Sequence, residues 1–475
     1  MKVYLILAKG TTMSFIYRAK QFILFSGDAI SLMLGLWVSI SLRFFSPSPF
    51  HEYTQVLTAF IFVFIVWIFI NGINGLYDLE KMNNTFFFYR RITESSIISL
   101  LFGVIYFYAL PTQNITPKTI LLLTVICSYS FIALWRLLYN SYIGKNTLQI
   151  NILFVGYSSE VQELIDITKA NPGKGYVPVA LIDPNKDIES KNLSDITVYR
   201  TLKTIRPAIT NHKINLVVIA PDLKQNTEAL RELYELLFWP VHITNLPTLY
   251  ETVTGRIPPI TFSEGWFLDH LKNKERAIYD HMRTCFDYAI AILLLPLFFV
   301  LFPFIALAII STSPGPVFIK QLRVGKNGKE FFLYKFRSMY ALSKDGSAEI
   351  QGAQFAQKND ERITSVGKIL RKTRMDELPQ LLNILKRDVA LIGPRPERPE
   401  IVRQLEEKMP YYSLRHTIKP GLTGWAAVHQ HYTDTLETSL QKLQYDLFYI
   451  KNRSFLLDLS IFLRTINVVV RMMGQ

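Results

Sequence analysis

The sequence predicts a membrane protein with a four-helix transmembrane bundle, a Rossmann-like α/β domain, and a C-terminal α/β domain that carries a re-entrant membrane helix. Three observations predict this fold class. Four apolar stretches of membrane-spanning length come first, and short β-branched runs then alternate with helical patterns. The last part opens with a long stretch, 288–319, that holds no charged residue.

Composition agrees with this fold class. The 475 residues are 49% hydrophobic and 19% charged, with a mean hydropathy of +0.19. These values exclude a disordered chain and argue against an ordinary cytosolic protein. Two cysteines, Cys127 and Cys285, exclude a disulfide framework and show no zinc-type spacing.

The net charge of +14 is concentrated in the C-terminal part. Residues 272–475 carry a net charge of +11, whereas residues 144–271 carry −2. Nucleic acid, anionic lipid or a phosphorylated substrate would each attract such a charge. The apolar composition favours membrane lipid and phosphate, so no nucleic acid partner is predicted.

The bundle is predicted over residues 1–145. Each of its four spans has about the 20 residues that cross a bilayer as a helix: Phe22–Leu42, Val56–Ile73, Ile92–Leu110 and Ile120–Leu138. Basic residues gather before the first span (Lys2, Lys9, Arg18, Lys20), between the second and third (Lys81, Arg90, Arg91) and after the fourth (Arg136, Lys145). This pattern predicts that both ends of the bundle face the cytoplasm. Asp28 lies within the first span, and it either faces a partner helix or sits near the interface.

Residues 146–250 show βα alternation, which predicts a small parallel sheet. The expected strands are Ile150–Val155, Val177–Ile182, Leu216–Ile219 and Val241–Thr244, and the clearest helical patterns are Glu160–Ala170 and Thr227–Leu237. The first turn has one glycine, Gly156, where a dinucleotide fingerprint has three. A structural or regulatory role is therefore predicted, and 251–275 is assigned as a linker.

The uncharged stretch predicts a re-entrant helix over about 285–311. Basic residues flank it on both sides, with Arg276 and Arg283 before it and Lys320 and Arg323 after it. One crossing cannot leave both positive flanks in the cytoplasm. Pro296 and Pro303 offer places to break the helix. A fifth span or a core helix are the alternatives.

The remainder of the C-terminal part, 276–475, reads as a mixed α/β domain. Phe331–Phe336 predicts a strand and Pro379–Leu385 a helix. The amphipathic segment Phe455–Met473 either lies in the membrane surface or closes a core.

The densest polar cluster surrounds the pair Asp376-Glu377. One carboxylate can act as a nucleophile while the other holds a hard cation such as Mg²⁺. The alternative is helix capping, because Thr373 and Asp376 precede an apolar helix with Pro379 in its first turn.

Seven basic residues recur near this pair, and arginine matches phosphate oxygens in a bidentate way. They are Lys335, Arg337, Arg362, Arg371, Arg374, Arg395 and Arg398. Arg395 lies between two prolines that limit loop motion, as phosphate recognition requires. His429-x-His431 resembles a metal pair but lacks an obvious third ligand, so a polar loop is favoured.

Residues 276–470 resemble the bacterial sugar transferase family of monotopic polyprenyl-phosphate hexose-1-phosphate transferases. The matching motifs come in family order: Phe286-Asp287, Ser313-Pro314-Gly315-Pro316-Val317-Phe318, Lys320-Gln321-Leu322-Arg323-Val324-Gly325, Tyr334-Lys335-Phe336-Arg337-Ser338-Met339, Arg362-Ile363-Thr364, Asp376-Glu377-Leu378-Pro379-Gln380-Leu381, Gly393-Pro394-Arg395-Pro396, Lys419-Pro420-Gly421-Leu422-Thr423-Gly424-Trp425, Leu443-Gln444-Tyr445-Asp446-Leu447 and Asn452-Arg453-Ser454. The whole chain looks like the large members, such as undecaprenyl-phosphate glucose phosphotransferases, that initiate exopolysaccharide or O-antigen repeat units.

The resemblance implies an enzyme that moves a hexose-1-phosphate, with glucose the first expectation, from a UDP-sugar to undecaprenyl phosphate and releases UMP. It implies that Asp376 forms a covalent phosphosugar intermediate and that Glu377, with Asp376, holds Mg²⁺. Substrate- or phosphate-binding roles follow for Lys335, Arg337, Arg362, Arg371, Arg395, Gln321, Arg323 and Asp446. The protein is expected in the bacterial inner (cytoplasmic) membrane as a multi-pass protein, with its catalytic domain on the cytoplasmic face. Polysaccharide assembly proteins and a second copy of the chain are possible partners.

Some positions depart from the family pattern. Phe299-Val300 stands where many members have a Ser-Pro break, and Thr284 stands where a basic residue is common. Ala426-Ala427-Val428-His429 replaces a frequent Ala-Gln-Val-Asn, which leaves sugar and acceptor recognition open. A non-catalytic membrane scaffold is the alternative function. A transporter is a weaker one, because only Asp28 is a clear ionisable residue within the bundle spans.

Overall fold

The computed structural model describes residues 12–44, 50–77, 86–109, 118–144, 149–172, 175–185, 195–225, 227–271, 277–341, 362–430 and 435–470. The chain forms two compact units, Met1–Thr254 and Gly255–Gln475. Several residues used in the sequence predictions, among them Lys2, Lys9, Lys81, Lys145, Arg276 and His431, lie outside the described residues.

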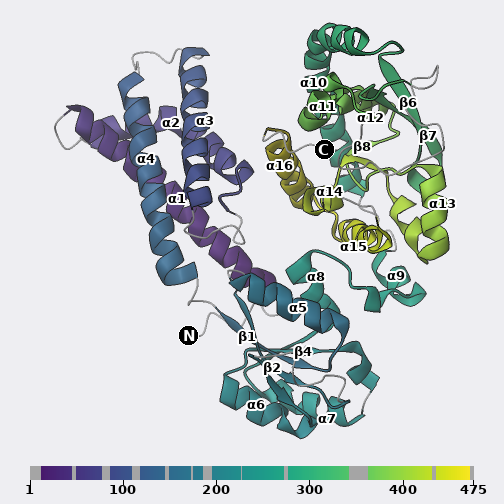
Figure 1. The fold of residues 1–475 in the computed structure, drawn as a ribbon. Coiled ribbons are helices and arrows are strands. Elements are labelled where there is room, and N and C mark those ends of the chain that lie inside the picture. Colours follow the sequence, from purple (N-terminus) through teal and green to yellow (C-terminus); the bar gives the residue numbers. More distant parts are fainter. Residues whose placement is uncertain are drawn as a thin grey trace. The chain divides into compact units, whose positions relative to one another are not determined.

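The first unit begins with the predicted bundle (Figure 1). Its helices are α1 (Thr12–Phe44), α2 (Phe50–Ile73), α3 (Phe86–Ala109) and α4 (Lys118–Leu138), and a π-helical turn, Tyr139–Gly144, follows α4. Within the described residues, four segments are long and apolar enough to span a membrane: Ala19–Arg43, Val56–Ile73, Ile120–Tyr142 and Ile278–Thr312. The third predicted span is a helix of 24 residues, α3, but it is not among these four.

Asp28 faces a partner helix, which decides between its two predicted positions. Its Oδ2 lies 2.6 Å from Nη2 of Arg136 on α4, and both side chains are fully buried. Arg136 therefore has a carboxylate partner inside the bundle. A buried pair of this kind fixes the register of α1 against α4 more than it stabilises the bundle.

The Rossmann-like domain of the first unit contains a parallel five-stranded sheet in the order β3-β2-β1-β4-β5. Its strands are β1 (Ile150–Val155), β2 (Tyr176–Ile182), β3 (Thr197–Tyr199), β4 (Leu216–Ile219) and β5 (His242–Asn245). Helices α5 (Ser159–Ala170) and α8 (Leu246–Thr254) cover one face, while α6 (Ile205–His212) and α7 (Thr227–Glu235) cover the other (Figure 1). The four predicted strands are confirmed, and the short edge strand β3 was not predicted.

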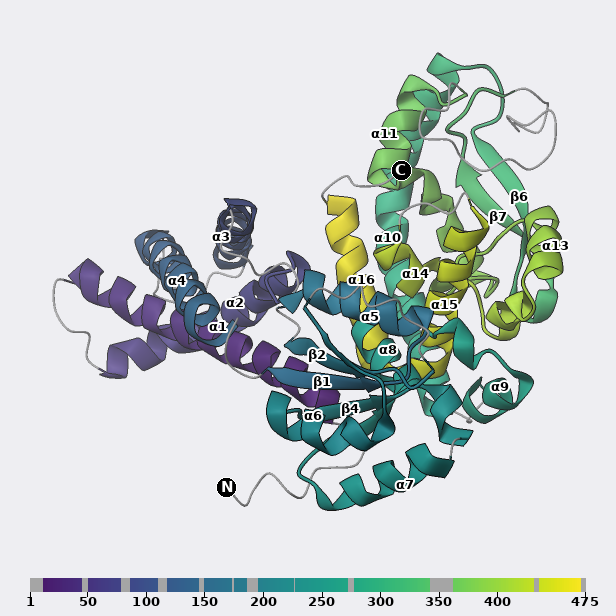
Figure 2. The ribbon, with the colours of Figure 1, turned by 60° about the horizontal axis from the view of Figure 1, so that its bottom comes forward.

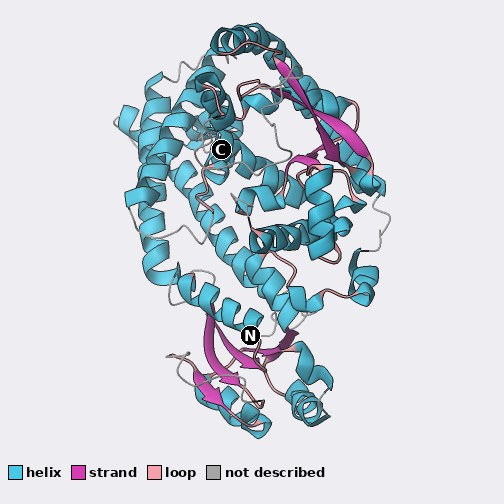
Figure 3. Cartoon of the chain, turned by 45° about the vertical axis from the view of Figure 1, so that its right-hand side comes forward, coloured by secondary structure: helices cyan, strands magenta, loops and turns pink. Residues whose placement is uncertain are grey.

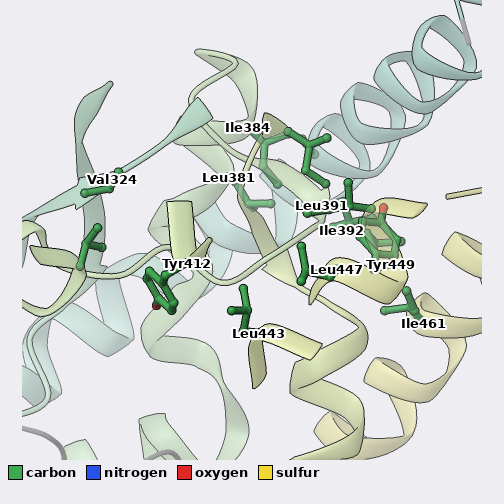
Figure 4. Packing of buried hydrophobic residues seen from close by; sticks show 14 of the residues in the cluster. Val324, Leu381, Ile384, Leu391, Ile392, Tyr412, Leu443, Leu447, Tyr449 and Ile461 are labelled. Carbon is green, nitrogen blue, oxygen red and sulfur yellow. The ribbon is translucent and has the colours of Figure 1, made fainter. Parts of the chain in front are cut away.

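The second unit contains the antiparallel hairpin of β6 (Phe318–Val324) and β7 (Glu330–Phe336), shown in magenta in Figure 3, and a short parallel pair, β8 (Ala390–Ile392) with β9 (Gly421–Thr423). Its helices are α9 (Glu264–Leu271), α10 (Ala277–Thr312), α11 (Ser365–Thr373), α12 (Leu381–Leu385), α13 (Pro399–Lys408), α14 (Trp425–His429), α15 (Leu436–Asn452) and α16 (Phe455–Val470). Buried side chains such as Leu381, Ile392 and Leu443 meet in one core (Figure 4). The predicted strand at 331–336 and the helix ending at 385 are confirmed.

The segment predicted as a linker, 251–275, belongs largely to the second unit. Ile257 is fully buried and Phe267, on α9, is nearly so, and both lie in the core of that unit. The sequence hides this role because its apolar residues follow no sustained helix or strand period, and the prolines at 258 and 259 interrupt the pattern. Core packing extends at least to Ile257, close to the boundary between the units at Thr254.

Helix α10 continues without interruption from Ala277 to Thr312, with Pro296 and Pro303 inside it. Ala291, Phe298 and Ile305 are buried at intervals of seven residues, and Ile309, one turn after Ile305, is buried as well. All four belong to the core. The opposite face leaves large apolar side chains exposed, including Phe304 at 69%. The helix lies beside α11 (Figure 2) and packs on the domain through one face only. This differs from a helix broken at either proline.

The amphipathic segment near the C-terminus forms α16 and closes the core. Ile461 is fully buried. Asp458 accepts hydrogen bonds from the hydroxyls of Tyr279 and Tyr449, at 2.6 and 2.8 Å. Of the two predicted roles, core closure is the one these contacts show.

Candidate functional site

The carboxylate pair sits at a sharp change of direction between two helices. Helix α11 ends at Thr373 and is followed by Arg374, which has a φ of 59°, and then by a 3₁₀ helix, Met375–Gln380. This turn buries both Asp376 and Glu377, each 8% exposed. The residue before the 3₁₀ helix, Arg374, and the residue before α12, Gln380, make no side-chain cap, and neither carboxylate takes that position. Both acids do lie in the first turn of the 3₁₀ helix, where the helix dipole favours negative charge, so a role at the helix terminus stays a prediction.

Glu377 is surrounded by three basic side chains. Its Oε1 accepts a hydrogen bond from Nη2 of Arg395 at 2.6 Å, and it lies 3.4 Å from Nη1 of Arg374 and 3.8 Å from Nζ of Lys335. Burial by itself raises the pKa of this carboxyl, but Arg395, Lys335 and Arg374 outweigh burial and hold the pKa well below its usual range. Glu377 is thus a permanently charged anchor for basic groups.

Asp376 lies in a different environment. Its Oδ1 is buried and has no hydrogen-bond partner among the described residues. Burial, reinforced by the charge of Glu377, raises the pKa of its carboxyl, against the opposing effect of Lys335, Arg371 and Arg374. The surroundings therefore stabilise the charged form of Glu377 and disfavour the charged form of Asp376. Such a difference between neighbouring carboxylates usually accompanies different chemical roles.

Lys335 reaches the pair from strand β7. Residue 335 is paired with Ile319 of β6, so the hairpin fixes its backbone. Its side chain is only 15% exposed. Burial lowers the pKa of the Lys335 ammonium to about 8, although Glu377 favours the charged form.

The loop that carries Arg395 is closely packed against the strand that follows Lys419-Pro420. The Gly393 N–H donates to the Thr423 carbonyl at 2.8 Å, and the Gly421 N–H donates to the Pro394 carbonyl at 2.9 Å. A Cβ on Gly421 would lie 2.0 Å from the Gly393 nitrogen, so only glycine permits this approach. The loop therefore presents Arg395 from a rigid support.

The other predicted site residues fall into two groups. Arg371 lies near Asp376 and donates to Ser338 Oγ at 2.9 Å. Arg337 is buried, and its guanidinium donates to the carbonyls of Ser313 and Pro314 at 2.7 and 2.5 Å, which fixes the end of α10. The backbone carbonyl of Arg362 accepts a hydrogen bond from the Tyr340 N–H. The phosphate-binding roles predicted for these residues stay predictions.

Gln321, Arg323 and Asp446 lie in the support of the site. Gln321 accepts a hydrogen bond from Arg323 at 2.8 Å, and Arg323 also donates to the Pro396 carbonyl at 3.2 Å. Asp446 is 2% exposed, and its Oδ2 lies 2.9 Å from Nη2 of Arg415. Because this carboxylate holds an arginine, its position does not favour the predicted contact with phosphate.

The sequence prediction missed Arg415. This buried residue lies in a 3₁₀ helix, Tyr412–Thr417, and donates to the Arg395 carbonyl at 2.8 Å. Its sequence signal is weak, since it is one arginine in a segment that carries no other feature of a site. His429, whose pairing with His431 suggested metal binding, has both ring nitrogens in contact, with Trp425 O and Arg464.

The carboxylates fit a hard cation that is shared with substrate. No cluster of three or more His, Cys, Asp or Glu side chains suited to a metal occurs in the described part of the chain. Mg²⁺ needs only one or two carboxylates when substrate phosphates and water complete its shell. The unpartnered Oδ1 of Asp376 and the adjacent Glu377 supply oxygens of this type.

Comparison with known proteins places this site in a family. The family model described as bacterial sugar transferase matches residues 278–472. A UDP-glucose:undecaprenyl-phosphate glucose-1-phosphate transferase of Caulobacter vibrioides is 40% identical over a segment that covers 40% of this chain and 70% of that relative. The chain belongs to the bacterial sugar transferase family. The resemblance drawn from the motifs is thereby confirmed, and every member of the Asp376 site lies within the matched residues.

Two further family relatives extend the likeness toward the N-terminus. A UDP-N-acetylgalactosamine-undecaprenyl-phosphate N-acetylgalactosaminephosphotransferase of Aeromonas hydrophila is 39% identical over 49% of this chain and 53% of its own length. A UDP-glucose:undecaprenyl-phosphate glucose-1-phosphate transferase of Xanthomonas campestris pv. campestris is 33% identical over 56% of this chain and 54% of its own. The match thus spans about half the length of these two relatives. A second family model, described as a CoA-binding domain, matches residues 72–247 and includes the Rossmann-like domain.

Proposed function

We propose that this protein transfers a hexose-1-phosphate from a UDP-sugar to undecaprenyl phosphate and releases UMP. The observation that supports this most directly is the buried pair Asp376-Glu377, in which one carboxylate oxygen has no hydrogen-bond partner among the described residues while basic side chains surround the pair. Such a site is built for an anionic substrate that reacts with a carboxylate. The names of the relatives supply the substrate classes.

The proposed reaction has two steps. An oxygen of Asp376 attacks the β-phosphorus of the UDP-sugar, the bond from that phosphorus to the bridging oxygen breaks, and UMP leaves with the electron pair. A phosphate oxygen of undecaprenyl phosphate then attacks the same phosphorus and releases Asp376. The products are UMP and undecaprenyl diphosphosugar. Covalent capture divides a transfer between two anionic substrates into two easier steps.

The basic residues have separate tasks in this scheme. Arg395 and Lys335 are held by Glu377, so they are oriented before substrate arrives. Arg371 and Arg374 favour the charged form of Asp376, and Arg374 also lies 3.4 Å from Glu377. Preoriented cations stabilise charge on a transferring phosphoryl group without reorganising at the moment of reaction.

Mg²⁺ belongs to the proposal. Asp376 and Glu377 would hold the ion together with the pyrophosphate of the substrate, and it would supply charge neutralisation on the leaving UMP. Three basic side chains already offset part of the charge of Glu377, which weakens the attraction of this carboxylate for the ion.

We further propose that α10 lies within one leaflet and that both of its ends face the cytoplasm. Its buried residues, from Arg283 to Ile309, contact the same domain that carries the catalytic pair. A helix that packs on a polar domain along its length cannot also cross about 30 Å of hydrocarbon. Its exposed apolar face suits lipid. Placement in the inner membrane follows from the cytoplasmic UDP-sugar substrate.

Glucose is the proposed sugar, and the test is a panel of substrates. Purified protein in detergent is given undecaprenyl phosphate, Mg²⁺ and one UDP-sugar at a time, and UMP is measured. UMP release with UDP-glucose above UDP-galactose and UDP-N-acetylgalactosamine supports the proposal. Release with another sugar corrects the substrate, and no release with any sugar favours the scaffold alternative.

A further inference from the structure

The loop that presents Arg395 has its backbone carbonyls held one after another. The Pro394 carbonyl accepts from the Gly421 N–H, and the Glu397 carbonyl accepts from the Val324 N–H. Between them, the Pro396 carbonyl accepts from Arg323 at 3.2 Å. The remaining one, the carbonyl of Arg395 itself, accepts from Nη2 of Arg415 at 2.8 Å.

Arg415 is itself fixed by a buried carboxylate and a buried hydroxyl. Its Nη2 lies 2.9 Å from Oδ2 of Asp446, and both side chains are 2% exposed. Its Nη1 donates to the hydroxyl of Tyr412. Burial of this carboxyl raises the pKa of Asp446, while Arg415 and then Lys442 oppose that shift. Moving the guanidinium away would leave the buried Asp446 carboxylate without this counter-charge, which favours the observed position of Arg415.

Arg395 therefore takes part in two networks, one through its backbone carbonyl and one through its guanidinium. Its carbonyl is held by Arg415, while its guanidinium donates to Glu377 at 2.6 Å. Arg415 bonds to the backbone of the loop, so a substitution at position 415 can displace Arg395 while every side chain beside Asp376 and Glu377 keeps its identity. A misplacement of about 1 Å in a catalytic constellation can cost about a hundredfold in rate.

We infer that Arg415, oriented by Asp446, is a positioning residue for the proposed transfer and acts by fixing the place of Arg395. The kinetic consequence of this inference rests on the proposed function. Its structural consequence, a fixed position of Arg395, rests on the geometry alone. Lysine at position 415 keeps the charge but cannot bond to the Arg395 carbonyl, Asp446 and Tyr412 in one planar fork.

The kinetic test is a double-mutant cycle in the full-length protein, with Arg415→Lys, Arg395→Ala and the double variant. We expect Arg415→Lys to lower kcat for UMP release by about tenfold to a hundredfold, with a KM for the UDP-sugar within about threefold of the parent. The double variant should be no slower than Arg395→Ala, because Arg415 acts through Arg395. Losses that multiply in the double variant would overturn the inference.

The structural test does not depend on activity. The amides of Gly421 and Val324 donate to the Pro394 and Glu397 carbonyls on either side of Arg395. Their hydrogen exchange should speed up at least tenfold in Arg415→Lys and should stay unchanged in Arg256→Lys. Arg256 is a matched control, a buried arginine of the same unit that donates to Gln444. If Arg415→Lys does not fold, Asp446→Asn replaces it, since this near-isosteric change loosens Arg415 and leaves its bond to Arg395 possible.

These outcomes separate the two claims. A parent protein that releases no UMP from any UDP-sugar contradicts the proposed function, whereas loop exchange still tests the position of Arg395. Unchanged exchange in both Arg415→Lys and Asp446→Asn overturns the positioning role even if the parent is active. The positioning role is supported by faster exchange together with a loss of kcat from Arg415→Lys that occurs when Arg395 is intact and not in the Arg395→Ala background.

Discussion

Arg395 donates a hydrogen bond from Nη2 to Oε1 of Glu377 at 2.6 Å, across 18 residues of sequence. This contact joins the loop at 393–397 to the 3₁₀ helix that carries the carboxylate pair. Glu377 thereby orients basic groups, whereas Asp376 has an oxygen with no hydrogen-bond partner in the part of the chain that the structure describes. The predictions for the site follow from this division.

Asp376→Asn is expected to reduce UMP release by at least about a thousandfold while the protein folds and inserts normally. The carboxamide has nearly the same shape, but it cannot form the phosphosugar bond. Asp269→Asn, at an exposed position on α9, is the control and should keep full activity. Near-normal turnover in Asp376→Asn would rule out the nucleophile. A phosphosugar adduct seen by mass spectrometry in the parent and absent from the variant would support it.

Glu377→Gln is expected to raise the Mg²⁺ concentration that gives half-maximal activity by at least about tenfold, and to lower kcat as well. The amide loses the charge that orients Arg395 and Lys335, and it is a poorer ligand for a hard cation. The measurement is a Mg²⁺ titration of UMP release in the parent and the variant. An unchanged Mg²⁺ midpoint would show that Glu377 orients basic groups only.

Single cysteines on either side of α10 are expected to lie on the same side of the membrane. Asp269→Cys and Lys329→Cys, each in a background without Cys127 and Cys285, place labels at exposed positions before and after the helix. Both should resist an impermeant reagent in intact cells and react in inverted vesicles. Labelling of position 329 alone in intact cells would show that α10 crosses the bilayer.

Asp28→Asn is expected to destabilise the bundle by about 3–5 kcal/mol, because it leaves the fully buried Arg136 without a counter-charge. The double variant Asp28→Leu/Arg136→Met should recover most of that loss, since it removes both charges. Thermal unfolding in detergent measures both effects. If the double variant loses as much stability as Asp28→Leu and Arg136→Met lose together, the two residues do not act as a pair.

Stability at low pH is expected to depend on Glu397. Burial opposes its charge, but Lys442, Arg415 and Arg323 lower its pKa from 4.5 to about 2 in the folded protein. The folded state binds fewer protons, so this group contributes up to about 3 kcal/mol above pH 4.5 and loses it as the pH falls toward 2. Chemical unfolding should show Glu397→Gln less stable than the parent at pH 7. The gap should close between pH 4.5 and about 2, and a gap constant with pH would contradict this assignment.

The sequence alone established the local elements and the motif chemistry. Apolar length predicted the bundle helices, and βα alternation predicted strands that the sheet confirms, since these are properties of consecutive residues. The order of the motifs identified the family, which the family model confirms. Adjacent acids at 376 and 377 drew attention to the pair, but their spacing could not separate capping from catalysis.

Tertiary structure decided which charges meet. Asp28 and Arg136 are 108 residues apart, and Arg415 and Arg395 are 20 apart, so no local pattern relates them. It also assigned Arg337 to the carbonyls at the end of α10, and it placed Phe267 of the predicted linker in a core. Hydrophobic periodicity specifies which face of an element is buried. The partner of a buried charge depends on which elements then pack together, because only packing brings the charges within hydrogen-bond distance and removes the water that would otherwise screen them.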